Sequence, residues 1–240
     1  MATRNVKAAA IAKAKSAPVV GFTAVSFSRL NDWKKCPAYA RFKHLDKLPE
    51  PGSIYLERGS AIHKLAENFT VAKKAGKLPI ELAQFDAEFK ALRKRRPVTE
   101  EQWAFDKNWE PSSWFDKSTF CRVVVDCWYH DLKRNVLVII DHKTGKLNAT
   151  HEEQLSLYAL AGLMKNESVD GVEVMLWYLD HGIISPEEEK VYMRSEVKSL
   201  QEKWNALFRP MTIDKRFAPK PNNGCQYCAY SKAKKGPCEF

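Results

Sequence analysis

The sequence predicts an α/β fold in which a central mixed β-sheet is flanked by helices. Its 240 residues, 45% of them hydrophobic, are enough for one large domain or for one domain with an appendage. The hydrophobic period changes along the chain in the order helices, three strands, helix, strands, helix. No apolar run approaches the roughly 20 residues needed to cross a bilayer. Disordered, collagen-like and membrane-spanning classes are therefore excluded.

Helices are expected in the first hundred residues. The predicted ranges are residues 26–35, a short helix from residue 37, residues 58–75 and residues 81–95. Ser26 or Ser28 can cap the first helix, and Pro37 fits the first turn of the second. Gly76 and Pro97 are the residues expected to end the two longer helices.

Beyond Pro97 the hydrophobic period becomes two, which is typical of strands. The predicted strands are residues 98–109, 120–129, 135–143, 172–179 and 190–194. A turn around residues 131–134 joins the second and third strands. Further helices are expected over residues 151–165 and 196–208, and a segment rich in Pro, Lys and Cys follows them.

The net charge of +10 is concentrated at the two ends of the chain. Residues 1–31 carry five basic and no acidic side chains, and residues 209–240 carry seven basic and two acidic ones. A neutral body with basic ends suits a polyanionic partner such as nucleic acid. The expected organisation is a basic flexible tail over residues 1–21, a main domain over 22–208 (helical segment 22–96, core 97–208), and a Cys-rich tail over 209–240.

Six cysteines are present, and no apolar segment of the kind found in secretory signals follows the N-terminal charges. We therefore expect a cytoplasmic protein, with an organellar transit peptide as the alternative. In a reducing compartment, closely spaced cysteines bind metal or do redox chemistry more often than they form structural disulfides. Cys225, Cys228 and Cys238 are therefore candidate ligands, whereas Cys121 and Cys127 are expected in the core.

An acid and an amine lie side by side at the end of the third predicted strand. Because side chains alternate along a strand, Asp141 and Lys143 share one face and His142 points to the other. Asp126 lies in the apolar run of the neighbouring strand, where a lone carboxylate needs a compensating cation. Two such carboxylates can bind one divalent ion, and oxygen ligands favour magnesium or manganese. The alternative is a pair of solvent-facing acids, with Lys143 as an ordinary salt-bridge partner.

Asp126, followed by fourteen residues and then Asp141-x-Lys143, resembles the PD-(D/E)XK nuclease superfamily. Three further segments resemble motifs of its RecB-like branch: SFSRLNDWKKCPAYARF its helical opening, RGSAIHKLAENF its histidine motif, and HEEQLSLYALAG its Gln-x-x-x-Tyr motif. The resemblance covers roughly residues 26–165 and implies a restriction-endonuclease-like core within a nuclease domain. Val125, which precedes Asp126, departs from the residues common at that position of the motif.

The resemblance implies His63, Asp126 and Asp141 as metal ligands, Lys143 with the two acids in catalysis, and Gln154 and Tyr158 as supports of the substrate or site. Glu101 is a further candidate acidic residue, and Glu100 competes with it. Taken without the resemblance, His63 would be a packed histidine paired with Glu67, and the Gln-x-x-x-Tyr motif an ordinary helical pair.

Iron–sulfur members of this branch, including AddB-type helicase-nucleases and CRISPR-adaptation exonucleases, place one cysteine before the nuclease core and three after it. The resemblance therefore implies a 4Fe-4S cluster bound by Cys36, Cys225, Cys228 and Cys238. A four-cysteine zinc site uses the same residue types and is the alternative.

The implied activity is that of a metal-dependent DNA exonuclease, which hydrolyses phosphodiester bonds in end processing, recombination or repair. A Mg²⁺ or Mn²⁺ ion would neutralise charge on the phosphate and lower the pKa of water, and Lys143 would orient that water. The sequence contains no P-loop pattern, so a helicase, recombination or CRISPR partner would be a separate protein. Two alternatives stay open: a non-catalytic, basic nucleic-acid-binding module with a structural zinc site, and a subunit that cuts only within a complex.

Overall fold

The computed structural model describes residues 21–72, 76–147, 150–186 and 190–240. The tail expected over residues 1–21 thus lies outside the described residues, apart from Gly21. The chain forms two compact units, which we call the end unit (the chain up to Gly52 together with Asn205–Phe240) and the sheet unit (Ser53–Trp204). Among the described residues, none of the helices combines the length and the apolar character needed to span a membrane.

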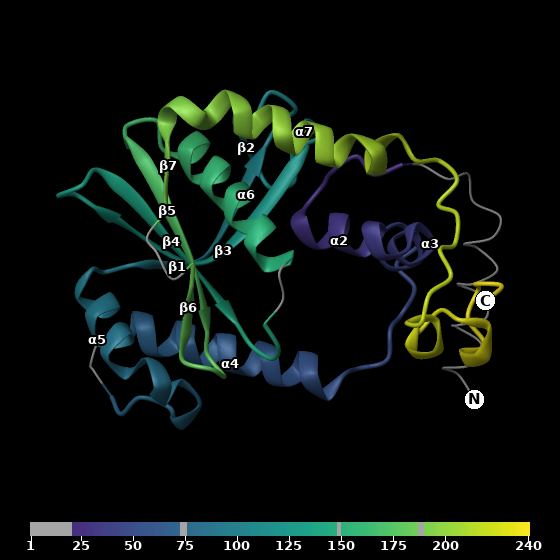
Figure 1. Ribbon diagram of the computed structural model, residues 1–240, viewed down its shortest axis with the longest axis horizontal. Helices are drawn as coiled ribbons and strands as arrows, with labels where there is room; N and C mark the ends of the chain where they lie inside the picture. Colours follow the sequence, from purple (N-terminus) through teal and green to yellow (C-terminus); the bar gives the residue numbers. More distant parts are fainter. Residues whose placement is uncertain (1–20, 73–75, 148–149, 187–189) are drawn as a thin grey trace. The chain divides into compact units, whose positions relative to one another are not determined.

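The sheet unit contains one seven-stranded mixed sheet, which confirms the predicted fold class (Figure 1). Its strands are β1 (Val98–Phe105), β2 (Pro111–Ser112), β3 (Cys121–Asp131), β4 (Val136–Lys143), β5 (Gly171–Tyr178), β6 (Ile183–Ser185) and β7 (Val191–Met193). The order is β2-β1-β3-β4-β5-β6, with β7 paired to β5. Only the β4–β5 pair is parallel, because the chain crosses between these two strands through a helix.

Helices cover both faces of this sheet (Figure 1). On one face lie α4 (Ile54–Val71) and α5 (Asp86–Lys94), whose Ile62, Ala66 and Phe89 are buried in a cluster with side chains of β3, β4 and β5. Helix α4 begins one turn before the helix predicted over residues 58–75, and it ends at Val71. The helix predicted from residue 81 begins as a 3-10 turn over Ile80–Phe85.

The opposite face is covered by α6 (Thr150–Lys165), which is the helix predicted over residues 151–165. Gly162 allows a close approach to the sheet, because a Cβ atom there would lie 3.0 Å from Val172 Cγ2 and 3.1 Å from Ile139 Cδ1. The last helix, α7 (Val197–Ile213), continues past Pro210 and is therefore longer than the predicted helix over residues 196–208.

The end unit brings the first and last described segments of the chain together. It contains α2 (Phe27–Lys35), α3 (Pro37–Ala40), a π-helical turn over Arg41–Leu45, and two 3-10 turns over Cys225–Tyr227 and Lys232–Lys234. Ser26 caps α2 by accepting the N–H of Arg29 at 3.3 Å, as expected. Trp33 Nε1 donates to Asp214 Oδ2 at 2.8 Å, and the Tyr230 hydroxyl donates to the Leu48 carbonyl at 3.0 Å.

We predict that Gly162→Val lowers the stability of the sheet unit. The added side chain would collide with Val172 and Ile139, and overpacking of this kind lowers the free energy of unfolding by about 1–3 kcal/mol. Urea denaturation followed by circular dichroism measures the change. Glu202→Val, on the exposed face of α7, is the control for the poor helix propensity of valine. Equal losses in the two variants would contradict the close packing of α6.

Candidate metal site and cysteine cavity

Two carboxylates lie where the hydrogen-bonded ladder between β3 and β4 ends. The last pair of that ladder is Cys127 with Ile140, so Asp126 and Asp141 would form the next one. The strands do not pair there, and Asp126 Oδ2 instead accepts the backbone N–H of His142 at 2.8 Å. The two acids are thereby held at one fork in the sheet.

A third acid comes from β1 through the register of the sheet. Strand β1 pairs with β3 at Thr99–Cys127 and at Glu101–Val125, so that Glu100 lies opposite Asp126. Glu100 has φ +52°, a left-handed conformation that is uncommon for residues other than glycine. Such strained residues cluster at functional sites, where the surrounding structure holds them in place.

Helix α4 adds a histidine to these acids. Donor atoms of His63, Glu100 and Asp126 all lie within 4.8 Å of one another, and His63 Nδ1 is 3.5 Å from Asp126 Oδ2. Carboxylate oxygens with one imidazole nitrogen can bind a divalent cation such as Mn²⁺. Of the predicted ligands, His63 and Asp126 thus belong to this trio, whereas Asp141 lies beside it.

Glu101, which we expected at the site, lies elsewhere. Its carboxylate accepts Trp128 Nε1 at 2.6 Å and lies 3.7 Å from Lys165 Nζ, a residue of α6. The physical reason is the strand register: Glu100 is opposite Asp126, and the next residue along the strand points to the opposite face. The competing residue, Glu100, is therefore the one that the structure brings to the site.

The other four predicted residues form a closed ring of polar contacts. Lys143 Nζ lies 2.5 Å from Asp141 Oδ2 and donates to Gln154 Oε1 at 3.0 Å. Gln154 Nε2 donates to the Tyr158 hydroxyl at 2.7 Å, and that hydroxyl donates to Asp141 Oδ1 at 2.7 Å. Both oxygens of the buried Asp141 are thus engaged, and the Lys143 ammonium is held in a fixed position.

Burial and neighbouring charges shift the pKa values of the three carboxyl groups at the site. Burial raises the pKa of Asp141, and the charge of Asp126 raises it further, although the Lys143 ammonium opposes both effects. Burial also acts to raise the pKa of Asp126, but the hydrogen bond and charge of His63 outweigh it and lower that pKa. Burial and then the charge of Asp126 raise the pKa of Glu100. A bound divalent cation would stabilise all three carboxylates in their ionised form.

His142 has a packing role. It lies on the face opposite Asp141 and Lys143, as predicted, with its ring 5.6 Å from that of Phe89 and 5.8 Å from that of Trp177. Burial lowers its pKa to about 4, so the ring is neutral at physiological pH.

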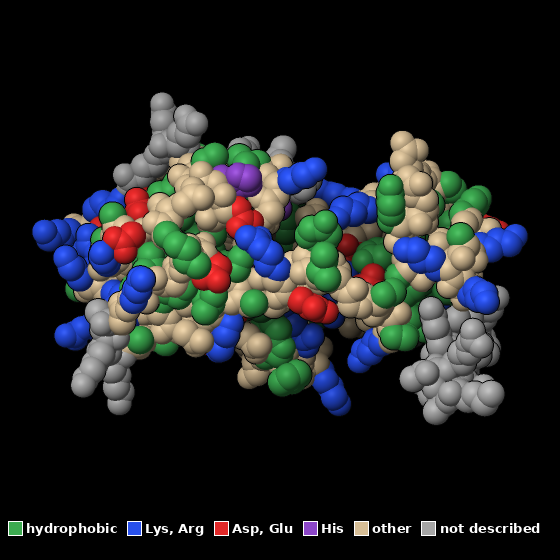
Figure 2. Space-filling view, turned by 90° about the horizontal axis from the view of Figure 1, so that it is seen from below, with side chains coloured by type: hydrophobic (Ala, Val, Ile, Leu, Met, Phe, Trp, Pro, Cys, Tyr) green, Lys and Arg blue, Asp and Glu red, His purple; other side chains and the backbone are tan. Residues whose placement is uncertain are grey.

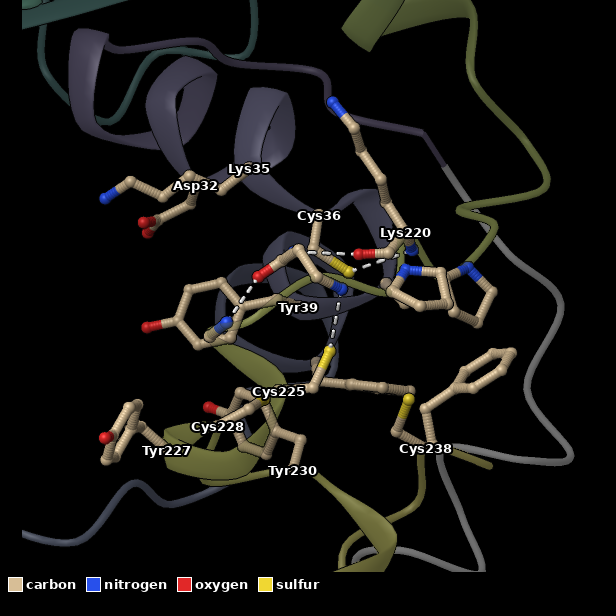
Figure 3. Close-up of a pocket in the computed structure, with 17 residues that line it drawn as sticks. Asp32, Lys35, Cys36, Tyr39, Lys220, Cys225, Tyr227, Cys228, Tyr230 and Cys238 are labelled. Carbon is tan, nitrogen blue, oxygen red and sulfur yellow. Dashed lines mark hydrogen bonds between the residues drawn. The ribbon is translucent and has the colours of Figure 1, made fainter.

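The end unit holds the second predicted site. Its four cysteines, Cys36, Cys225, Cys228 and Cys238, line one cavity of about 260 Å³ (Figure 3). All four thiols are free. Cys36 Sγ accepts the N–H of Lys220 at 3.4 Å, and Cys225 Sγ accepts the N–H of Asn222 at 3.3 Å.

The spacing of these sulfurs bears on what could fill the cavity. In the described part of the chain, only the His63 trio has three His, Cys, Asp or Glu donor atoms within 4.8 Å of one another. No three of the four sulfurs therefore lie within 4.8 Å of one another, whereas tetrahedral Zn–S bonds of about 2.3 Å place sulfurs about 3.8 Å apart. Cys121 and Cys127 are fully buried away from this cavity, as expected of core residues.

Comparison with known proteins places these residues in a family. The model of the PD-(D/E)XK nuclease superfamily matches residues 24–131 and 125–233. Among solved structures, a protein designated SSO0001 is 14% identical with a TM-score of 0.37, covering 96% of this chain and 94% of its own. A candidate exonuclease from Eubacterium rectale is 11% identical with a TM-score of 0.45, covering 86% and 87%. No curated protein gives a significant match.

We predict that Glu100→Gln weakens Mn²⁺ binding, whereas Glu101→Gln leaves it unchanged. The first variant removes a donor from the trio, and the second alters only the contacts with Trp128 and Lys165. A loss of about 10- to 100-fold or more is expected, since removing even a group that only orients a metal ligand has an effect of this size. Isothermal titration with MnCl₂ measures the affinity. A stronger effect of Glu101→Gln would contradict the assignment.

Proposed function

This chain belongs to the PD-(D/E)XK nuclease superfamily, and we propose that it is a divalent-metal-dependent deoxyribonuclease of the RecB-like branch. One observation carries the proposal: the His63, Glu100 and Asp126 donors lie beside the buried Asp141 and its ion pair with Lys143. We further propose that it acts as an exonuclease on DNA ends, because its motifs resemble those of RecB-like exonucleases. A helicase or a CRISPR-adaptation protein is the proposed partner.

The residues present suit Mg²⁺ or Mn²⁺. His63, Glu100 and Asp126 would hold the cation, with Asp141 as a further oxygen donor at the fork. When bound, such a cation neutralises charge on the scissile phosphate and lowers the pKa of water enough to supply a nucleophile at neutral pH.

Lys143 is the catalytic residue whose position the site fixes most closely. Asp141 and Gln154 hold its ammonium group at the edge of the acidic cluster. From there its N–H groups can orient the attacking water and stabilise the negative charge that grows on the phosphate oxygens. Gln154 and Tyr158 are positioning residues, because Tyr158 is buried and acts through Asp141.

DNA is the proposed substrate class. The chain carries a net charge of +10, and Lys and Arg side chains are spread over the face of the molecule seen in Figure 2. A basic surface attracts the phosphate backbone and releases its counterions on binding.

We propose a 4Fe-4S cluster for the cysteine cavity. Four thiols line it, which is the number of ligands that a 4Fe-4S cluster needs, and the resemblance to iron–sulfur members of the RecB-like branch favours the cluster over a four-cysteine zinc site. Pro219 and Pro221 lack an N–H, while Lys220 and Asn222 direct theirs at Cys36 and Cys225. Such hydrogen bonds stabilise the negative charge of thiolate ligands.

We predict that Lys143→Ala reduces cleavage of end-labelled DNA by about 100- to 1,000-fold, because it removes one charged group that stabilises the transition state. Single- and double-stranded substrates are incubated with Mg²⁺, Mn²⁺ or chelator, and DNA binding is measured in parallel. Lys133→Ala, in the exposed β3–β4 turn, is the matched control. Cleavage in chelator, or full activity of Lys143→Ala, would contradict the mechanism. Binding without cleavage by the wild type would favour the basic binding module.

For the cysteine cavity, anaerobically purified protein should be brown, with about four iron and four sulfide ions per chain. Cys36→Ala should lose most of this iron, whereas Cys121→Ala, at a buried position outside the cavity, should retain it. Elemental analysis and the visible absorption spectrum provide the readout. A colourless wild-type protein that contains zinc would overturn the cluster assignment.

A further inference from the structure

The apolar face of α4 extends beyond the sheet that it covers. Ile62 and Ala66 lie on this face and are 2% and 0% exposed. Tyr55 lies seven residues before Ile62 and eleven residues before Ala66, and it therefore belongs to the same helical stripe. Tyr55 is nevertheless 80% exposed, and its neighbour Leu56 is 69% exposed. The first turn of α4 therefore presents an uncovered aromatic ring.

This turn is fixed next to the proposed catalytic lysine. Arg58 donates to both oxygens of Asp180, at 2.9 and 2.6 Å, and Asp180 Oδ2 also accepts the N–H of Gly145 at 2.7 Å. At Gly59 the helix backbone approaches the same loop, because a Cβ there would lie 3.1 Å from Thr144 Oγ1. The loop that follows Lys143 is thus tied to the start of α4.

Tyr55 and His63 are eight residues apart, about 80° around the helix, on either side of the Gly59 position. Eight residues of helix separate them by about 12 Å along the axis at a rise of about 1.5 Å per residue. A stacked strand rises by about 3.4 Å per nucleotide, so this distance corresponds to about three to four nucleotides, or fewer in an extended strand.

We propose that Tyr55 is a stacking platform for an unpaired base of the DNA substrate, within about four nucleotides of the phosphate bound at the His63 trio. This inference rests on the proposed function and adds to it a specificity-determining residue for single-stranded DNA. Leu56 extends the apolar surface beside the ring. In a duplex the bases are already stacked on one another, so they are not free to stack on the tyrosine ring.

The properties of this surface fit a nucleic acid strand. A base has an apolar face that can cover the tyrosine ring, and stacking of this kind accepts any base. Glu57 lies exposed on this turn, and the nearby Asp180 is neutralised by Arg58, whose hydrogen bond lowers the pKa of Asp180 to about 2. Repulsion between Asp180 and the phosphates is thereby reduced.

The test measures binding of a fluorescent single-stranded oligonucleotide to full-length chain carrying Lys143→Ala, which prevents cleavage. Tyr55→Ala should weaken this binding by about 5- to 150-fold, the range for loss of one stacked base. Tyr55→Phe, which keeps the ring, should bind within about twofold of the parent, and duplex binding should change little in either variant.

Abasic scanning then locates the contact. One abasic position in the oligonucleotide should weaken binding to the parent protein but not to Tyr55→Ala, which has already lost the ring. The matched control is Phe115→Ala, which removes an aromatic side chain that is 87% exposed and leaves sensitivity at that position intact.

Unchanged single-strand affinity of Tyr55→Ala, or the absence of any abasic position coupled to Tyr55, would overturn the inference. A binding surface for protein would be indicated if duplex and single-strand affinities both stayed at the parent value while Tyr55→Ala altered self-association. Because the assay measures binding only, its outcome is separate from whether the wild type cleaves DNA, so this inference and the proposed function can fail independently.

Discussion

Mutual repulsion between Asp126 and Asp141 is the constraint around which the sheet unit is arranged. Both carboxylates lie at the fork between β3 and β4, and Asp141 is buried. Leaving a buried charge without its partner costs about 3–5 kcal/mol. His63 from one layer of helices and Lys143 from the strand itself offset the two charges. The groups that compensate these charges in the folded protein are therefore the same groups that the proposed chemistry uses.

The helices on the two faces of the sheet support this fork from opposite sides. Burial of Ile62 and Ala66 sets the position of α4, and hence of His63. The close approach at Gly162 sets the position of α6, which carries Gln154 and Tyr158. Because protein interiors are close-packed, a small change in the packing of either helix layer would displace site residues that the changed side chain does not contact.

Periodicity in the sequence was sufficient for most of the fold, because the long strands and helices carry strong apolar patterns. Strands β2 and β6 contain two and three residues, too few to show a period. The site was predictable where residues are neighbours along one element, such as Asp141 with Lys143 or Gln154 with Tyr158. Glu100 was not distinguishable from Glu101, because the choice depends on the register between β1 and β3, which no local pattern specifies.

The division into units has a consequence for how the protein is made. The sheet unit is inserted between two parts of the end unit, so its whole sequence leaves the ribosome before Asn205 does. Domains generally fold as units during synthesis, so the fork and its ring of contacts can form early. The cysteine cavity has to wait for Cys238, which follows Cys36 by about two hundred residues. Any metal that it holds is therefore acquired only after Cys238 has been synthesised, when the sheet unit can already have folded.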